Sequence, residues 1–328
     1  MVSSRKVNWG ILSTANIGIK RVIPAIGESP NGRVLAIASR SPSTAREVAG
    51  NLGIPQSYGS YAEMLDSKEV DAVYIPLPNS MHREFTVLAA ENGKHVLCEK
   101  PLALDSRECE EMISACERNH VLLMEAFMYR FHPQIAKLKE VLDAGKIGKL
   151  STIRAAFRIA MSDLNDIRYQ KGLGGGALYD VGCYCVNIMR LLVGDEPIRA
   201  QGMAHFNDQK SVDEAFVGIL RFPGSELGLF DCGFRSSPLQ TLEVVGDLAT
   251  LELSDPFVAS DSPTILKHGA EPETFMIEKA NSYGLMVGHF NQCILNDQKP
   301  RYSPMDGLRN MHVIDTLYAS AVGSSSRP

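Results

Sequence analysis

One lysine stands where a catalytic cation would act. Lys100 follows the apolar run Val96–Cys98, which predicts a buried strand, and precedes Pro101, which cannot continue a strand ladder. In an open α/β sheet, ligands bind beyond the carboxyl ends of the strands, so this position suits chemistry. A strand-end lysine is also common as a plain surface residue, and the rest of the chain must decide between the two.

A second polar group follows the glycines at 174–176. The helix predicted over 177–192 carries Asp180 and Tyr184 at a spacing of i, i+4, which puts both on one face, with Asn187 near the same stripe. A carboxylate, a phenol and an ammonium together form an acid–base set suited to interconverting an alcohol and a carbonyl. The alternative is that Asp180 is a helix cap and that Tyr184 and Asn187 are half-buried.

The elements that would position these residues fall into two regions. Up to about residue 125, short apolar runs alternate with helical segments, which predicts a doubly wound parallel sheet. After about residue 151, β-rich runs separated by turns predict a large, mostly antiparallel open sheet, hence an α+β domain. We expect a cofactor-binding Rossmann domain at 1–125 and a substrate-binding and oligomerisation domain at 126–328.

The turn after the first predicted strand looks like an altered dinucleotide-binding fingerprint. The G-x-G-x-x-G template places glycines at 13, 15 and 18, and the chain has Ser13, Ala15 and Gly18. Small residues still let the backbone approach a pyrophosphate, and the helix start offers free N–H groups. A tight turn without a ligand is the alternative. The residues of this turn assigned to cofactor contact are Ser13, Thr14, Ala15, Asn16 and Ile17.

The end of the second predicted strand favours NADP(H) over NAD(H). NAD sites usually carry an acid there for the ribose 2′-hydroxyl, and the chain has Ser39, Arg40 and Ser41 instead. A guanidinium and hydroxyls suit a 2′-phosphate. A surface arginine beginning a helix is the alternative. The cofactor contacts assigned to later strand ends are Leu77, Pro78, Asn79, His82, Glu99 and Lys100.

Composition excludes several other classes of function. The chain is 45% hydrophobic and 22% charged with a net charge of −5, which argues against a nucleic-acid or anionic-membrane partner. We find no apolar stretch long enough for a membrane span and no signal peptide. Seven cysteines without a Cys-x-x-Cys pair, and eight scattered histidines, argue against disulfides and a metal site. Reduced, buried thiols in a cytoplasmic protein are expected.

The motifs in this order resemble the glucose–fructose oxidoreductase / inositol dehydrogenase (Gfo/Idh/MocA) family over essentially the whole chain. The resemblance is carried by the segments 10–18, 99–101, 125–133 and 174–184. It implies that Lys100 binds the reacting oxygen beside the nicotinamide, that Asp180 is the aspartate of the glycine-rich helix, and that Arg168 contacts the cofactor near the nicotinamide. It also implies a homo-dimer or homo-tetramer formed through the C-terminal sheet.

Position 184 narrows the resemblance. Many members of the family have a histidine as the acid/base there, and this chain has Tyr184. Tyrosine is found in the branch that contains glucose–fructose oxidoreductase, the dimeric dihydrodiol / D-xylose dehydrogenases and the 3-ketosugar reductases. The fingerprint departs from the family pattern at Ser13 and Ala15, a departure that this branch tolerates.

These observations lead to one hypothesis and several open alternatives. We expect an NADP(H)-dependent oxidoreductase that oxidises a pyranose such as D-xylose or D-glucose at C1, with Lys100 and Tyr184 as the acid–base pair and Asp180 positioning the substrate. Reduction of a 3-keto group on a nucleotide-linked deoxysugar would use the same three residues. A non-catalytic NADP(H)-binding regulator should have lost them. A further alternative is an enzyme that holds its cofactor tightly and recycles it without releasing it.

Overall fold

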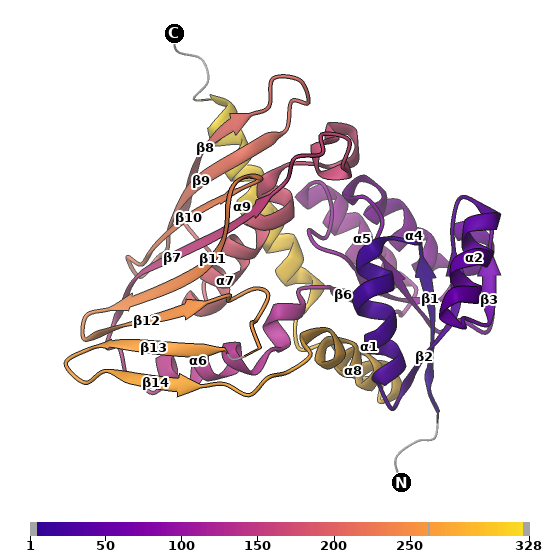
Figure 1. The fold of residues 1–328 in the computed structure, drawn as a ribbon, viewed down its shortest axis with the longest axis horizontal. Coiled ribbons are helices and arrows are strands. Elements are labelled where there is room, and N and C mark those ends of the chain that lie inside the picture. Colours follow the sequence, from indigo (N-terminus) through magenta and orange to yellow (C-terminus); the bar gives the residue numbers. More distant parts are fainter. Residues whose placement is uncertain (1–4, 262, 324–328) are drawn as a thin grey trace. The chain divides into compact units, whose positions relative to one another are not determined.

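The computed structural model describes residues 5–261 and 263–323, which form two compact units (Figure 1). Unit 1 contains the described residues up to Met128 together with Asn281–Leu308, and unit 2 contains Tyr129–Ala280 together with the chain from Arg309 onward. The return of residues 281–308 to unit 1 was not expected from the sequence. The functional division at residue 125, between cofactor binding and substrate binding, stays a prediction.

Unit 1 is built on the parallel sheet that the alternating pattern predicts. Its six strands have the order β3-β2-β1-β4-β5-β6, and every pair is parallel. The strands are β1 Val7–Leu12, β2 Gly32–Ala38, β3 Gln56–Tyr58, β4 Ala72–Ile75, β5 His95–Cys98 and β6 Leu123–Glu125. The order reverses between β1 and β4, where doubly wound sheets bind ligands. The predicted Rossmann sheet is therefore confirmed, with β3 as a strand that the sequence pattern did not show.

Helices connect these strands, and a C-terminal helix joins them. They are the π turn η1 Gly18–Val22, α1 Ile23–Glu28, α2 Pro42–Leu52, α3 Tyr61–Leu65, η2 Asn79–Met81, α4 His82–Glu91, α5 Ser106–Arg118 and α8 Ser282–Leu295. The apolar side of α8 is buried at Phe290, and Asn291 accepts a hydrogen bond of 2.9 Å from the Trp9 indole of β1. A buried indole N–H needs such a partner, so this contact ties α8 to the sheet.

Unit 2 contains the predicted large sheet. Its eight strands have the order β14-β13-β12-β11-β7-β10-β9-β8, and all pairs except β7–β10 are antiparallel. The strands are β7 Leu150–Ala160, β8 Arg199–Phe206, β9 Asp213–Arg221, β10 Leu227–Gly233, β11 Arg235–Gly246, β12 Ala249–Ser254, β13 Thr264–Gly269 and β14 Glu273–Met276. Along β9, buried Phe216 and Leu220 alternate with half-exposed Val217 and Ile219, so one face of the sheet is covered and the other is open.

Unit 2 also contains helices and helical turns, some of which pack on the buried face of this sheet. They are the 3₁₀ turn η3 Met128–Phe131, which starts in unit 1, α6 Pro133–Asp143, the 3₁₀ turns η4 Ile167–Tyr169 and η5 Lys171–Leu173, the π turn η6 Leu178–Gly182, α7 Cys183–Val193, and α9 Pro304–Gly323, which starts in unit 1. The predicted helix over 177–192 is present, but its first turn is π rather than α. The elements η6 and α7 pack on β7 and β10.

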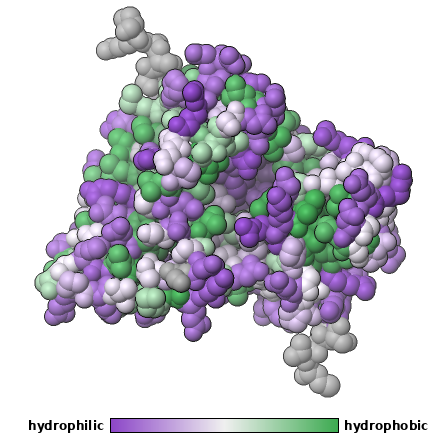
Figure 2. Space-filling view, viewed as in Figure 1, coloured by the Kyte–Doolittle hydropathy of each residue, from purple (hydrophilic) through white to green (hydrophobic). Residues whose placement is uncertain are grey.

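One helical segment within the described chain is long and apolar enough to cross a membrane by length and composition. It is Lys171–Val193, and 78% of its most apolar window is buried inside the structure. The core helix of a folded domain passes the same test, so the segment is weak evidence for a span. The surface shown in Figure 2 mixes hydrophilic and hydrophobic side chains. All seven cysteines are buried and free of disulfides.

Candidate active site

Apart from Arg168, which lies in η4 of unit 2, the residues assigned to the cofactor from the sequence follow carboxyl ends of neighbouring strands of unit 1. They come after β1, β2, β4 and β5, which are adjacent in the sheet. Because parallel strands end at the same edge, these segments share one rim of the unit. The strand-order reversal between β1 and β4 lies in the middle of this rim.

The turn after β1 has the backbone conformation of the dinucleotide-binding fingerprint, although Ser13 stands in place of the first glycine. Ser13 adopts φ 134°, a conformation that glycine takes without strain. The Ser13 hydroxyl accepts a hydrogen bond of 3.2 Å from the Ala15 amide, which stabilises the turn. The helix that follows begins near Asn16, and its first N–H groups have no acceptor within the helix. A pyrophosphate would satisfy them.

The segment after β2 presents one cation. Arg40 is exposed, and its guanidinium lies close enough to the Tyr61 hydroxyl to lower the pKa of that phenol, although burial has the larger, opposite effect. The two neighbouring hydroxyls have local roles. Ser39 accepts a hydrogen bond from the amide of Ser41, and Ser41 caps α2 by accepting one from Thr44. Arg40 is therefore the group of this segment best suited to a 2′-phosphate.

His82 holds two rim loops together. Its ring is fully buried, with Nε2 2.9 Å from the carbonyl of Leu77 and Nδ1 3.0 Å from the carbonyl of Pro101. Burial lowers the pKa of the imidazole, against the opposing effect of these carbonyls. Because both ring nitrogens face the backbone, His82 would support a cofactor through the loops after β4 and β5. Its predicted contact with the cofactor stays a prediction.

Hydrogen bonds that involve a buried phenol and a carboxylate hold the backbone at Lys100 in place. The Tyr74 hydroxyl of β4 donates a 2.6 Å hydrogen bond to Glu99, and burial raises the pKa of Tyr74 well above its ordinary value. The other oxygen of Glu99 accepts a bond from the Lys100 amide. The Lys100–Pro101 peptide bond is cis. These contacts fix the backbone from which the half-buried lysine side chain extends.

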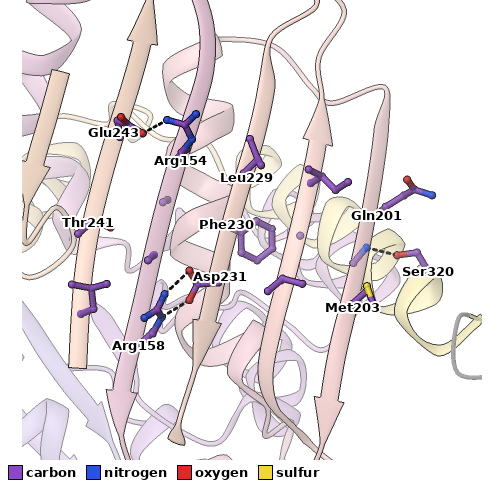
Figure 3. Close-up of a pocket in the computed structure, with 17 residues that line it drawn as sticks. Arg154, Arg158, Gln201, Met203, Leu229, Phe230, Asp231, Thr241, Glu243 and Ser320 are labelled. Carbon is purple, nitrogen blue, oxygen red and sulfur yellow. Dashed lines mark hydrogen bonds and ion pairs between the residues drawn. The ribbon is translucent and has the colours of Figure 1, made fainter. Parts of the chain in front are cut away.

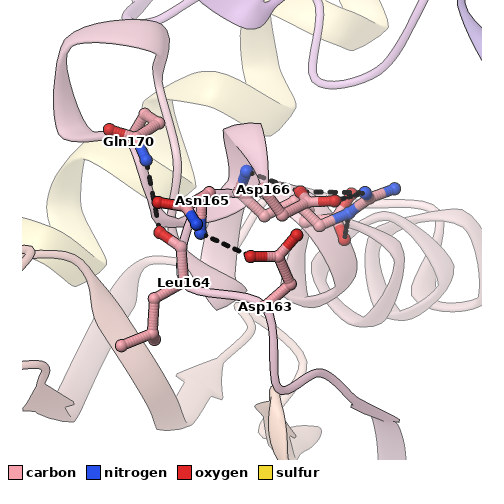
Figure 4. Close-up of polar contacts among 7 residues, drawn as sticks. Asp163, Leu164, Asn165, Asp166 and Gln170 are labelled. Atoms are coloured by element: carbon pink, nitrogen blue, oxygen red, sulfur yellow. Dashed lines mark hydrogen bonds and ion pairs between the residues drawn. The ribbon is translucent and has the colours of Figure 1, made fainter.

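In unit 2, an arginine lies between two carboxylates, one of which is Asp166 of the loop shown in Figure 4. The Arg168 Nε donates a 2.7 Å hydrogen bond to Asp180, and its Nη1 lies 3.3 Å from Asp166. The Asp180 charge is the largest of the effects that raise the pKa of this guanidinium. Asp166 also accepts from the Arg168 amide, so the acidic loop and the glycine-rich helix are joined through one side chain.

Tyr184 is packed among aromatic rings. Its ring centroid lies 5.7 Å from that of Tyr129, 5.3 Å from that of Phe157 and 5.5 Å from that of Phe257. The Tyr129 hydroxyl donates a 2.6 Å hydrogen bond to Asn187, one turn further along the helix. The Tyr184 side chain is only 6% exposed, so its ring has little freedom to turn. Sequence reasoning singled out Tyr184 and Asn187 but not the rings that hold them.

The donors at the rim of unit 1 fit a dinucleotide. Helix-start amides after β1 suit a pyrophosphate, Arg40 after β2 suits a 2′-phosphate, and Lys100 after β5 offers a cation where a reacting oxygen would lie. The small side chain of Ala15 and the absence of any at Gly18 leave the backbone of the turn approachable. This donor set therefore matches the group that the sequence resemblance implies.

Family models match both units. The model described as "Oxidoreductase family, NAD-binding Rossmann fold" (GFO_IDH_MocA) matches residues 7–127, and the one described as "GFO/IDH/MocA C-terminal domain" matches residues 135–252. The chain belongs to the Gfo/Idh/MocA oxidoreductase family. It is accordingly an NAD(P)-dependent oxidoreductase, and the family resemblance noted in the sequence is confirmed.

Named relatives within the family span nearly the whole chain. D-xylose 1-dehydrogenase (NADP(+)) 2 of Haloferax volcanii is 36% identical over 95% of this chain and 97% of its own. Trans-1,2-dihydrobenzene-1,2-diol dehydrogenase of Xenopus laevis is 31% identical over 96% of each chain. The crystal structure of a 3-ketoreductase from Actinomadura kijaniata with NADP and TDP-benzene has a TM-score of 0.93 and 28% identity, covering 96% of this chain and 98% of that one.

Variants of that 3-ketoreductase have also been solved. In one variant a lysine is replaced by alanine, and in another a tyrosine is replaced by phenylalanine. In its sequence the two replaced positions are separated by the same number of residues as Lys100 and Tyr184 are here. The likeness between the two proteins therefore includes the spacing of this lysine–tyrosine pair.

A large depression lies on the open face of the unit 2 sheet (Figure 3). It encloses about 800 Å³ and is lined by Met203, Val217 and Leu229, which point to the open face of the sheet. Tyr184 and Asp180 belong to η6 and α7, which pack on the covered face. The depression and the helix that carries Asp180 and Tyr184 therefore lie on opposite faces of the sheet.

Proposed function

We propose that the chain is an NADP(H)-dependent sugar oxidoreductase that oxidises a free aldopyranose, such as D-xylose or D-glucose, at C1. The observation that carries this proposal is the likeness to an NADP⁺-dependent xylose dehydrogenase over 95% of the chain, in a chain that presents Arg40 after β2 and Tyr184 in a fixed aromatic environment. Without an acid at the end of β2, nothing there repels a 2′-phosphate.

Each candidate residue then has a definite task. The bound nicotinamide supplies the acceptor for a hydride taken from the sugar carbon. Tyr184, as its phenolate, accepts the proton of the hydroxyl that is oxidised. The Lys100 ammonium stabilises the negative charge that develops on the same oxygen, and such electrostatic stabilisation is usually a large contribution. Asp180, held by Arg168, orients the sugar.

A second function is favoured by one specific observation. The solved structure with a TM-score of 0.93 is a 3-ketoreductase that was crystallised with a nucleotide-linked ligand. Reduction of a 3-keto group on a nucleotide-linked sugar would use the same residues, with the Tyr184 phenol now donating its proton. The lysine–tyrosine pair cannot distinguish the two reactions, because both interconvert an alcohol and a carbonyl.

A substrate screen tests the proposal directly. NADPH formation is followed by its absorbance with free aldoses and NADP⁺, and in parallel with NAD⁺. We expect turnover of a pentose or hexose with NADP⁺, lost in Lys100→Ala. Lys94→Ala serves as a control, because Lys94 bonds to the carbonyls of Ser67 and Val70 away from the rim. No turnover with any aldose, but oxidation of NADPH by a nucleotide-linked ketosugar, would overturn the aldose assignment in favour of the second function.

We further propose that the chain self-associates through the open face of the unit 2 sheet. The face exposes Met203, Val217 and Ile219, at 67%, 49% and 49%. It also carries ion pairs between Arg158 and Asp231 and between Arg154 and Glu243 (Figure 3). A second copy turned about a two-fold axis would present the same mixture of apolar side chains and both charges, so the face is complementary to itself.

A further inference from the structure

A buried carboxylate lies at the start of the helix that carries Asp180 and Tyr184. Asp213, the first residue of β9, is 1% exposed. Its Oδ2 accepts a 2.7 Å hydrogen bond from the Leu178 amide, and its Oδ1 accepts one of 2.7 Å from the Tyr318 hydroxyl of α9. A further bond comes from the Ala177 amide. A buried charge is costly unless donors surround it, and here the donors come from a helix start and a phenol.

These bonds replace a local helix cap. The first N–H groups of a helix have no intrahelical acceptor and are usually satisfied by the side chain just before the helix. Ala177 precedes η6 and offers no such side chain. Asp213 supplies the acceptor from a strand 35 residues further along the chain. The cap therefore fastens the start of the helix to the sheet.

Gly176 makes this close approach possible. It adopts φ 131°, and a Cβ at this position would lie 2.2 Å from Asp213 Oδ1 and 2.9 Å from the Tyr318 hydroxyl. The Gly176 amide donates to the Arg168 carbonyl, and its own carbonyl accepts from the Asp180 amide. The Asp213 carboxylate is therefore connected, through hydrogen bonds and the backbone at Gly176, to the residues that form the Arg168–Asp180 ion pair.

We propose that Asp213 is a positioning residue for the reaction: by capping the helix at Leu178 it holds Asp180 and Tyr184 in place without touching the substrate. The Tyr318 hydroxyl orients the carboxylate, and the Tyr318 ring packs against Tyr179 at 5.0 Å between centroids. The inference rests on the proposed function, because it takes its importance from the roles given there to Asp180 and Tyr184. It adds that Asp213, a strand residue outside the glycine-rich segment, affects the rate of the reaction by positioning Asp180 and Tyr184.

The test compares three variants by steady-state kinetics. Asp213→Ala removes the acceptor and should lower kcat by tenfold to about a hundredfold, the scale expected for a small misplacement of catalytic groups. The Kd for NADPH should change much less than kcat, because the candidate cofactor residues other than Arg168 belong to unit 1. Asp213→Asn should restore most of kcat, since its amide oxygen can accept from Leu178. Leu251→Ala creates a cavity elsewhere in unit 2 and should leave kcat unchanged.

Hydrogen exchange provides a readout that does not depend on a substrate. The amides of residues 177–180 should exchange faster in Asp213→Ala than in wild type or in Leu251→Ala. If Asp213→Ala does not fold, Tyr318→Phe replaces it, with a severalfold loss of kcat and the same amides less protected. Equal kcat in wild type and Asp213→Ala, equal losses in Asp213→Ala and Leu251→Ala, or unchanged exchange would overturn the inference. A wild-type protein inactive toward all sugars would overturn the proposed function, and exchange alone would then decide on Asp213.

Discussion

The stability of unit 2 should depend on pH through Asp213. Burial, opposed by the hydrogen bonds from Leu178 and Tyr318, raises the pKa of Asp213 from 3.8 to about 7. An unfolded chain releases this proton near the ordinary value, whereas the folded chain keeps it up to about neutral pH. The contribution to stability is therefore complete below about pH 4 and is lost as the pH rises through the folded pKa near 7.

The size of the effect follows from the shift. One pKa unit corresponds to about 1.4 kcal/mol, so this carboxyl should cost the folded state about 2–3 kcal/mol between about pH 5 and about pH 8. The titratable groups that face Asp213 are Tyr318 of α9 and Cys232 of β10. Burial raises the pKa of both well above their ordinary values, so neither of them titrates in this range.

Asp213→Asn is the variant for this measurement. Asparagine does not titrate, its oxygen can accept from the Leu178 amide, and its amino group can donate to the Tyr318 oxygen. The free energy of unfolding of both proteins is measured in urea, followed by circular dichroism, at several pH values. We expect the stability of wild type relative to Asp213→Asn to fall by about 2–3 kcal/mol from about pH 5 to about pH 8. A difference that stays constant would refute the burial argument.

Three further outcomes are expected. Tyr184→Phe should lower kcat by about 10²–10⁴-fold, the usual contribution of a general acid–base group, while NADPH binding measured by fluorescence is unchanged. Arg40→Ala should raise the KM for NADP⁺ by tenfold or more and leave the KM for NAD⁺ nearly unchanged. Arg46→Ala, which removes a charge from the same helix region, is the control. Equal effects of Arg40→Ala on both cofactors would contradict the assignment. Val217→Asp on the open sheet face should give monomers in light scattering, whereas Val258→Asp, equally exposed but outside the strands, should not.

The fold was predictable because its signals are local and repeated. Strand and helix periods over the first 125 residues predicted the parallel sheet, and the apolar run Val96–Cys98 followed by Pro101 placed Lys100 at the end of a strand. Three strands were missed. The predictions did not include β3, β13 and β14, which have three, six and four residues and lack a strict alternation. No local signal in the sequence indicated that α8 belongs to unit 1, because the hydrogen bond between Trp9 and Asn291 joins residues far apart in the chain.

The residues of the candidate site were predicted from the sequence, but their arrangement in space was predicted only in part. Tyr184 and Asp180 were selected by their spacing after the glycines, but the spacing assumed an α-helix where the first turn is π. What holds this turn comes from elsewhere in the chain, from Asp213 on a strand and Tyr318 on the last helix. A single aspartate at the start of a strand has no pattern of its own in the sequence. Long-range caps of this kind can be recognised only when the structure places the carboxylate against the unsatisfied amides.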